Sequence, residues 1–194
     1  MQFQEKPTIV IPAYNRPNAL ARLLRSVAHA DYEGYDNVQL IISVDKSDKP
    51  ETSKVAEEFK WNQGEKFVFH HDQHLGLRGN VLFCGGLAKE YGSVILLEDD
   101  LLAAPTFYDY AVKAKNFFGN DERIAGISLY AYNYNEFARM FFYPLDDGFD
   151  NYFIQNSASW GQLWTNEQWI EFEKWYRDHS GGTFYAGPHL PYDL

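Results

Sequence analysis

The stretch Val94–Leu101, VILLEDDL, runs from four apolar residues directly into three acidic ones. A short apolar run of this kind is typical of a strand that is buried on both faces of a sheet. Adjacent carboxylates repel one another, and a fold tolerates that repulsion most easily in water or around a cation. The stretch therefore predicts a buried strand that ends either in a solvated acidic turn or in a cation site.

Three similar apolar runs precede this one and alternate with helical patterns. We expect strands at 8–12, 38–45 and 66–71, a helix from Asn18 onward, a short helix through Val55 and Phe59, and a helix over 80–92. This alternation predicts an α/β fold with a mostly parallel central sheet flanked by helices. A chain of 194 residues is long enough for one such domain and too short for two comfortable ones.

The second half of the chain begins regularly and then changes character. We expect a helix over 104–119 and a strand over 123–130, followed by an irregular, aromatic-rich stretch and a last helix that Thr165 caps. The tail beyond that helix has little periodicity, as expected where a longer protein has been cut. We accordingly divide the domain into an α/β region, residues 1–130, and an aromatic-rich region, residues 131–194.

Composition limits the partners of this chain. Its net charge is −10 and its pI is near 5.0, so a nucleic-acid partner bound through a broad basic surface is not expected. Cys84 is the only cysteine, which excludes an intramolecular disulfide and a cysteine-based zinc site. There is no signal-peptide pattern and no apolar run long enough to span a bilayer. We expect a cytoplasmic protein and leave open its attachment to a membrane surface.

Polar residues follow three of the expected strands. Tyr14, Asn15 and Arg16 come after the first, Asp45 ends the second, and the acids 98–100 come after the fourth. In open parallel α/β sheets, ligands bind beyond the C-terminal ends of the strands. Acids, an arginine and an aromatic side chain at that edge would suit a nucleotide diphosphate carried on a divalent cation.

Four segments, in this order and spacing, resemble the nucleotide-sugar-binding region of GT-A-fold glycosyltransferases: PTIVIPAYNRPNALARLLRSV, VQLIISVD, HLGLRGNVLFCGGL and VILLEDDLLAAPTFYDY. They resemble the inverting family 2, and within it the subset with Glu-Asp-Asp that includes N-acetylglucosaminyltransferase I. The segment NSASWGQLWTNEQW is similar to a tryptophan-rich segment of bacterial members of that subset. The resemblance covers roughly residues 7 to 178.

The resemblance implies an enzyme that moves a sugar from a nucleotide diphosphate, with UDP expected, to an acceptor hydroxyl on a glycan, lipid-linked or protein-linked acceptor. It makes residues 131–194 the acceptor side. It implies that Asp100 binds Mn²⁺ or Mg²⁺. It also implies a nucleotide-sugar site formed by Pro12, Tyr14, Asn15, Arg16, Asp45, Arg78, Glu98 and Asp99.

Two parts of the chain depart from the family pattern. His74 stands where family 2 often has asparagine. For the general base, the last helix offers Glu171, Glu173 and Asp178 as well as Glu167, and Glu167 fits the position in bacterial members best.

Simpler interpretations remain open at several positions. The acids could be a solvated helix start, and Asp45 could form an Asx turn. His70 and His71 should point to opposite faces of a strand, which argues against a metal site. We expect Trp160 near the acceptor and Trp169 in the core. The alternative functions are a binding domain that has lost catalysis and a nucleotidyltransferase, although PAYNRPN lacks the glycines of a phosphate loop.

Overall fold

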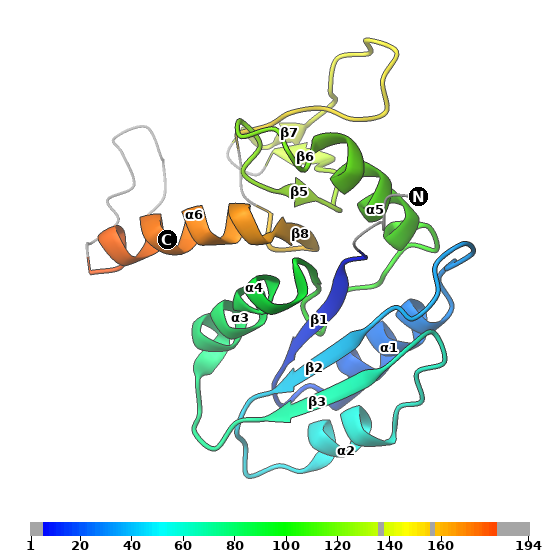
Figure 1. The fold of residues 1–194 in the computed structure, drawn as a ribbon, viewed down its shortest axis with the longest axis vertical. Coiled ribbons are helices and arrows are strands. Elements are labelled where there is room, and N and C mark those ends of the chain that lie inside the picture. Colours follow the sequence, from blue (N-terminus) through cyan, green and yellow to red (C-terminus); the bar gives the residue numbers. More distant parts are fainter. Residues whose placement is uncertain (1–5, 136–137, 156–157, 182–194) are drawn as a thin grey trace.

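A computed structural model of the chain describes residues 6–135, 138–155 and 158–181 (Figure 1). In the described part, the central sheet has six strands in the order β3-β2-β1-β4-β8-β5. β1, β2, β3 and β4 are mutually parallel, and β8 runs antiparallel to both β4 and β5. The strands are β1 (Thr8–Ala13), β2 (Leu40–Val44), β3 (Lys66–His70), β4 (Ser93–Leu96), β5 (Ile127–Ser128) and β8 (Gln162–Thr165). A separate hairpin pairs β6 (Tyr134–Asn135) with β7 (Met140–Phe141).

Helices cover both faces of this sheet. One face packs against α1 (Pro17–Ala28), α2 (Glu51–Glu58) and α5 (Phe107–Phe118). The other face packs against α3 (Gly76–Gly86), α4 (Ala88–Tyr91) and α6 (Asn166–His179). β1, β2 and β4 are buried along their whole length, as expected for parallel strands covered on both sides.

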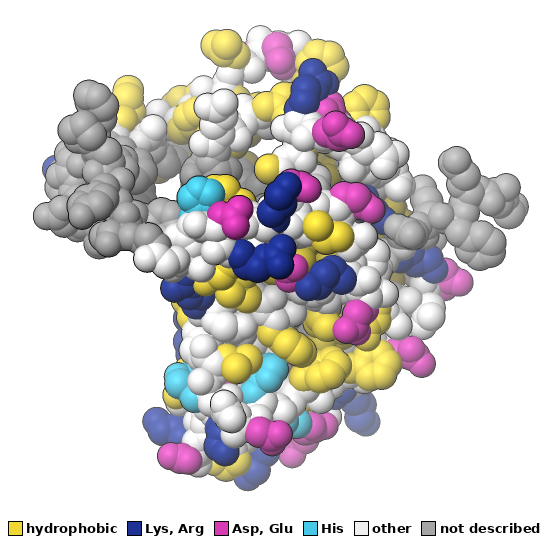
Figure 2. All heavy atoms as spheres, turned by 60° about the vertical axis from the view of Figure 1, so that its left-hand side comes forward, with side chains coloured by type: hydrophobic (Ala, Val, Ile, Leu, Met, Phe, Trp, Pro, Cys, Tyr) yellow, Lys and Arg dark blue, Asp and Glu magenta, His cyan; other side chains and the backbone are white. Residues whose placement is uncertain are grey.

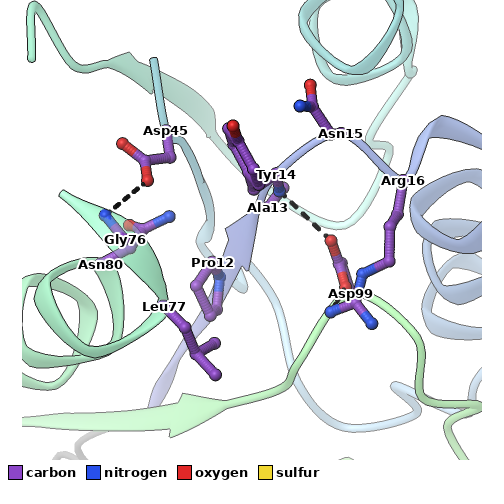
Figure 3. Close-up of a pocket in the computed structure, with 10 residues that line it drawn as sticks. All are labelled: Pro12, Ala13, Tyr14, Asn15, Arg16, Asp45, Gly76, Leu77, Asn80 and Asp99. Carbon is purple, nitrogen blue, oxygen red and sulfur yellow. Dashed lines mark hydrogen bonds and ion pairs between the residues drawn. The ribbon is translucent and has the colours of Figure 1, made fainter. Parts of the chain in front are cut away.

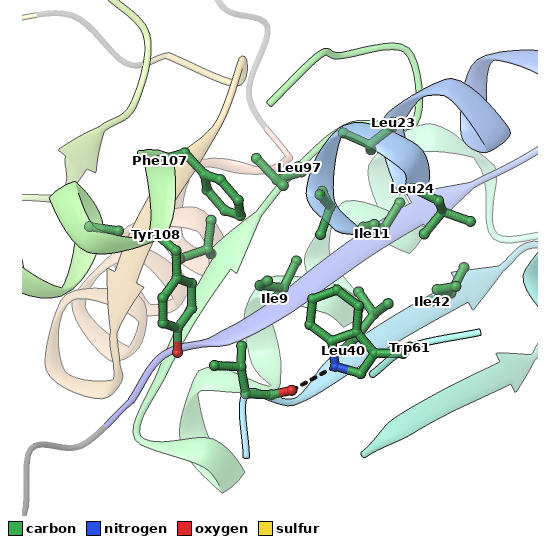
Figure 4. Packing of buried hydrophobic residues seen from close by; sticks show 14 of the residues in the cluster. Ile9, Ile11, Leu23, Leu24, Leu40, Ile42, Trp61, Leu97, Phe107 and Tyr108 are labelled. Atoms are coloured by element: carbon green, nitrogen blue, oxygen red, sulfur yellow. Dashed lines mark hydrogen bonds between the residues drawn. The ribbon is translucent and has the colours of Figure 1, made fainter. Parts of the chain in front are cut away.

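Alternate side chains along the central strands point into two different hydrophobic clusters. Ile9 and Ile11 of β1 point into the larger cluster, where they meet α1 and α5 (Figure 4). Val10, between them, points into the smaller cluster, together with Cys84 of α3 and Trp169 of α6. Burial raises the pKa of the Cys84 thiol to about 12, so this cysteine is a protonated core residue.

The α/β fold with a mainly parallel central sheet is confirmed, but several element boundaries were wrong. The helix predicted over 80–92 begins four residues earlier and divides into α3 and α4. The strand predicted over 123–130 shrinks to two residues, Ile127–Ser128. β8, which the sequence did not reveal, lies between β4 and β5 and joins the aromatic-rich region to the central sheet.

Thr165 caps the last helix, as predicted, and the structure adds a capping box there. Thr165 Oγ1 accepts a hydrogen bond from the Gln168 backbone N–H, and Gln168 Oε1 accepts one from the Thr165 N–H. Trp169, expected in the core, is only 2% exposed, and its ring lies against α3. Among the residues that the structure describes, no helix combines the length and apolar character needed to cross a bilayer.

Two adjacent glycines test how closely α3 and α6 approach. A Cβ on Gly85 would overlap the Trp169 ring, whereas a Cβ on Gly86 would keep 3.8 Å from Trp169 Nε1. We therefore expect Gly85→Ala to lower the free energy of unfolding by about 1–3 kcal/mol through overpacking. Gly86→Ala, the matched control, should be neutral or stabilising by up to about 1 kcal/mol, because alanine favours helix. Urea unfolding measures both, and equal effects of the two variants would contradict the packing described.

Candidate functional site

A cavity of about 260 Å³ lies at the C-terminal edge of the parallel strands (Figure 3). β1 lies there between β2 and β4, so the chain order reverses beside it, which is where open α/β sheets bind ligands. Its lining comes from the ends of β1 and β2, from the start of α3 and from the turn after β4. The lining residues are Pro12, Ala13, Tyr14, Asn15, Arg16, Asp45, Gly76, Leu77, Asn80 and Asp99.

Arg16 joins two acids at one side of this cavity. Its Nη2 lies 2.6 Å from Asp99 Oδ1, and its Nη1 lies 2.6 Å from Asp100 Oδ2. The Asp99 side chain is 2% exposed, whereas that of Asp100 is 46% exposed. The Tyr14 backbone N–H also donates to Asp99 Oδ2, at 3.3 Å. The guanidinium thus offsets the repulsion between two neighbouring carboxylates.

The surroundings of Asp99 disfavour the ionised form of its carboxyl group. Its burial raises the pKa of the carboxyl, and the negative charge of Asp100 adds to this, although the Tyr14 N–H and Arg16 work in the opposite direction. Asp99 Oδ1 makes an ion pair with Arg16 but lies out of line for a hydrogen bond. An additional cation or donor at this oxygen would therefore stabilise the ionised form.

Asp45 holds the loop that leads into α3. Its Oδ1 accepts hydrogen bonds from the backbone N–H groups of Lys46 and Leu75, and its Oδ2 accepts one from Gly76. His74 Nδ1 lies 3.0 Å from the same Oδ2. The carboxylate therefore organises the far wall of the cavity. Its contact within its own segment is with the next residue, Lys46, and differs from the contact two residues on that defines an Asx turn.

An aromatic pair marks the mouth of the cavity. The Tyr14 ring is 40% exposed, and its centroid lies 4.8 Å from that of His74, which belongs to the loop that Asp45 holds. Asn15, between Tyr14 and Arg16, has a φ of 49° and accepts a hydrogen bond from Ser47. This left-handed residue turns the chain, so that Tyr14 and Arg16 serve different sides of the cavity.

Three predicted site residues lie elsewhere. Glu98 is half-buried and does not line the cavity. The guanidinium of Arg78 lies 5.0 Å from the Tyr176 ring centre on α6, as a cation–π pair. Glu167 lies at the opposite edge of the sheet, because β8 runs antiparallel to β4 and pairs Thr165 with Ser93. The length of β4, roughly 13 Å at 3.3 Å per residue, separates it from the acids.

A second, larger cavity of about 1030 Å³ borders the acids on their other side. Asp100 lines it together with apolar and aromatic residues of α5 and of the segments 97–107, 123–132, 150–155 and 158–164. Trp160 is 46% exposed here and meets the Tyr130 ring edge-on at 4.9 Å. Asp99 thus faces the small cavity and Asp100 the large one.

The sequence profile of glycosyl transferase family 2 matches residues 8–169. The chain belongs to this family. The match includes both strands that carry the acids and Arg16, together with β8 and the start of α6. No curated protein gives a match to the chain.

Solved glycosyltransferases resemble this family 2 domain at low identity. TarS 1-349 of S. aureus matches with 18% identity and a TM-score of 0.48 over 59% of this chain and 33% of its own. The mannosyltransferase PcManGT of Pyrobaculum calidifontis, solved with GDP-Man and Mn²⁺, matches with 15% identity and a TM-score of 0.48 over 66% and 36%. The galactosyltransferase LgtC, solved with donor and acceptor sugar analogues, matches with 13% identity and a TM-score of 0.47 over 92% and 66%. The chain spans about a third of the S. aureus TarS fragment.

The acids of this family 2 domain can take part in a metal site without forming a complete one. Among the described residues, no group of three or more His, Cys, Asp or Glu side chains could enclose a metal ion. Divalent cations that serve phosphate ligands commonly take only one or two protein carboxylates, because the phosphates and water complete the shell. Asp99 and Asp100 fit that requirement.

Sequence reasoning missed four residues of the small cavity: Ala13, Gly76, Leu77 and Asn80. The apolar side chain of Leu77 is 68% exposed and lies in the first turn of α3, which the predicted helix started too late to include.

Figure 2, which brings the left side of Figure 1 forward, shows basic side chains next to acidic ones at the centre of that face. This face therefore has no broad surface of a single sign, and anion binding has to rely on a few placed groups.

The raised pKa of Asp99 predicts how its substitution changes stability with pH. Because the folded-state pKa lies above the ordinary value of 3.8, ionised Asp99 costs stability at neutral pH, and this cost disappears as the pH falls through the folded-state pKa. Asp99→Asn, without ligand, should therefore be at least as stable as the unaltered chain at pH 7. Its relative advantage should shrink toward pH 3.8. Urea unfolding over a pH series measures this.

Asp109→Asn is the matched control, because the pKa of Asp109 is shifted in the opposite direction from that of Asp99. Hydrogen bonds from Lys113 and Tyr35 lower the pKa of Asp109, so its carboxylate stabilises the fold above the ordinary value of 3.8. That variant should lose stability at pH 7, and its deficit should vanish in acid. An Asp99→Asn variant that follows the Asp109→Asn pattern would contradict the environment described for Asp99.

Proposed function

We propose that this domain is an inverting, metal-dependent glycosyltransferase of the Glu-Asp-Asp subset of family 2. It transfers a sugar from a UDP-sugar donor to an acceptor hydroxyl. One observation carries the proposal: Arg16, Asp99 and Asp100 form a charged cluster between two cavities, at the edge of the sheet where such folds bind nucleotides.

The small cavity is the nucleoside side. Its volume of about 260 Å³ suits a base and part of a ribose, and the Tyr14 ring at its mouth offers a face for stacking. Pro12 and Asn15 shape the strand end beneath that ring. The diphosphate would then extend toward Arg16, whose fork of donors matches phosphate oxygens.

Asp99 and Asp100 are the residues that would hold Mn²⁺ or Mg²⁺, with Asp100 as the more accessible ligand. Such a cation stabilises the negative charge that develops on a departing diphosphate. Arg16 lies beside both acids, so its guanidinium would lie next to the phosphate oxygens of a nucleotide whose cation these carboxylates held.

The large cavity is the acceptor side. Trp160 and Tyr130 present aromatic surfaces there, which suit the apolar faces of sugar rings. Inversion requires an acceptor in this cavity to attack the anomeric carbon from the side opposite the diphosphate. The acids that line the cavity are Asp100 and Asp150 among the described residues, so we assign deprotonation of the acceptor to Asp150 instead of the distant Glu167.

Nucleotide binding tests this proposal. Millimolar UDP with Mn²⁺ should raise the melting temperature of the unaltered chain, since a ligand at 100 times its dissociation constant stabilises by about 2.7 kcal/mol. UDP alone should raise it far less, and Asp100→Asn should remove the effect of Mn²⁺. Asp178→Asn makes the same acid-to-amide change on the exposed surface of α6 and is the control that should behave as the unaltered chain.

A UDP shift that is independent of Mn²⁺, or that survives in Asp100→Asn, would contradict the metal assignment. The products formed from UDP-sugar distinguish the transferase from the two alternative functions. A transferase releases UDP from UDP-sugar slowly even without acceptor, a binding domain releases none, and a nucleotidyltransferase exchanges pyrophosphate into the nucleotide.

A further inference from the structure

Asn80 is a buried amide with a fixed orientation in the wall of the small cavity. It is 3% exposed, and Ser43 of β2 holds both ends of its amide. The Ser43 hydroxyl donates to Asn80 Oδ1 at 2.5 Å, and Asn80 Nδ2 donates to the Ser43 carbonyl oxygen at 3.0 Å. Because a carbonyl can only accept, the group that faces it has to be the NH₂, so the two ends of the amide are distinguishable.

His71 supports this arrangement from behind. Its Nε2 lies 2.8 Å from Ser43 Oγ. Ser43 has only one hydroxyl hydrogen, which Asn80 already accepts, so His71 Nε2 has to be the donor in that contact. The ring of Phe83 meets the His71 ring edge-on at 4.7 Å. The result is a directed series of hydrogen bonds from His71 to Ser43 to Asn80.

One hydrogen of the Asn80 amide remains unused. The NH₂ group carries two hydrogens, and Ser43 accepts only one of them; no other described residue accepts from Nδ2. Leaving a buried donor unpaired costs about 1–3 kcal/mol, so such a group is expected to meet a ligand or water. Asn80 lines the small cavity beside Pro12 and Leu77 (Figure 3). Asp45, the neighbouring polar side chain, is already engaged by three backbone N–H groups and His74.

We infer that the free N–H of Asn80 donates to the C4 carbonyl of uracil and thereby selects UDP over CDP. The inference rests on the proposed function and names the residue that reads the base. Cytosine carries an amino group at C4, so its N–H would face the N–H of Asn80, and neither group could be satisfied. Asn80 is thus a specificity-determining residue, and Ser43 and His71 are positioning residues.

Isothermal titration calorimetry tests the inference. It measures the affinities for UDP and for CDP, each with Mn²⁺, in the unaltered chain, in Asn80→Leu and in Asn80→Asp. The unaltered chain should bind UDP at least about tenfold more tightly than CDP, as one hydrogen bond and one avoided clash imply. Asn80→Leu should weaken UDP binding and tighten CDP binding, because it removes both the hydrogen bond to uracil and the clash with cytosine, and the ratio of the two affinities should approach one. Asn80→Asp should favour CDP, because a carboxylate oxygen accepts from the cytosine amino group.

Variants of the positioning residues Ser43 and His71 test the inference independently, because they leave Asn80 itself unchanged. Ser43→Ala and His71→Leu should each reduce the ratio of the affinity for UDP to the affinity for CDP. His71→Gln should preserve this ratio, because glutamine can still donate a hydrogen bond to Ser43. A purely structural role would weaken both nucleotides equally and leave the ratio intact.

The outcomes separate this inference from the proposed function. If UDP binds and its preference over CDP survives in both Asn80→Leu and Ser43→Ala, the assignment of Asn80 is overturned and the proposed function stands. If neither nucleotide binds the unaltered chain, the proposed function falls, and the assignment falls with it.

Discussion

The site depends on one ion-paired cluster, in which the guanidinium of Arg16 lies between the carboxylates of Asp99 and Asp100. Arg16 follows β1 and the acids follow β4, so the contact exists only because these two strands are parallel neighbours, with Val10 opposite Leu96. A nearly fully buried Asp99 would be costly without that cation beside it. The order of the sheet therefore brings the charges together, and the arginine makes their proximity tolerable.

The same geometry places a positive charge at the sheet edge of a chain whose net charge is −10. At the sheet edge, the charge of Arg16 is set against those of Asp99 and Asp100. Asp45 contributes indirectly, since its carboxylate fixes the loop at Leu75 and Gly76 that forms the far wall. The two cavities then differ in character: the small one is lined by strand ends and the start of α3, and the large one mainly by apolar and aromatic side chains.

Local patterns predicted much of this structure, because they depend on nearby residues. The four parallel strands, the Thr165 cap and the buried Trp169 follow from apolar periodicity and capping chemistry. The expectation that His70 and His71 face opposite ways is also confirmed, since His70 pairs with Glu57 on α2 and His71 with Ser43 on the α3 side. Gathering Tyr14, Arg16, Asp45 and Asp99 at one edge required only the rule for parallel strands.

What sequence could not provide depends on long-range pairing. β8 has four residues and no periodic signal, yet its antiparallel direction decides that Glu167 lies away from the acids. Arg78 faces Tyr176, more than ninety positions away, and the amide of Asn80 on α3 is oriented by Ser43 on β2. A crystal structure of the chain with UDP and Mn²⁺ tests the central claim most directly. The account predicts a Mn²⁺ anomalous peak within coordination distance of Asp100 and uracil in the small cavity beside Tyr14; UDP bound at any other edge of the sheet would contradict it.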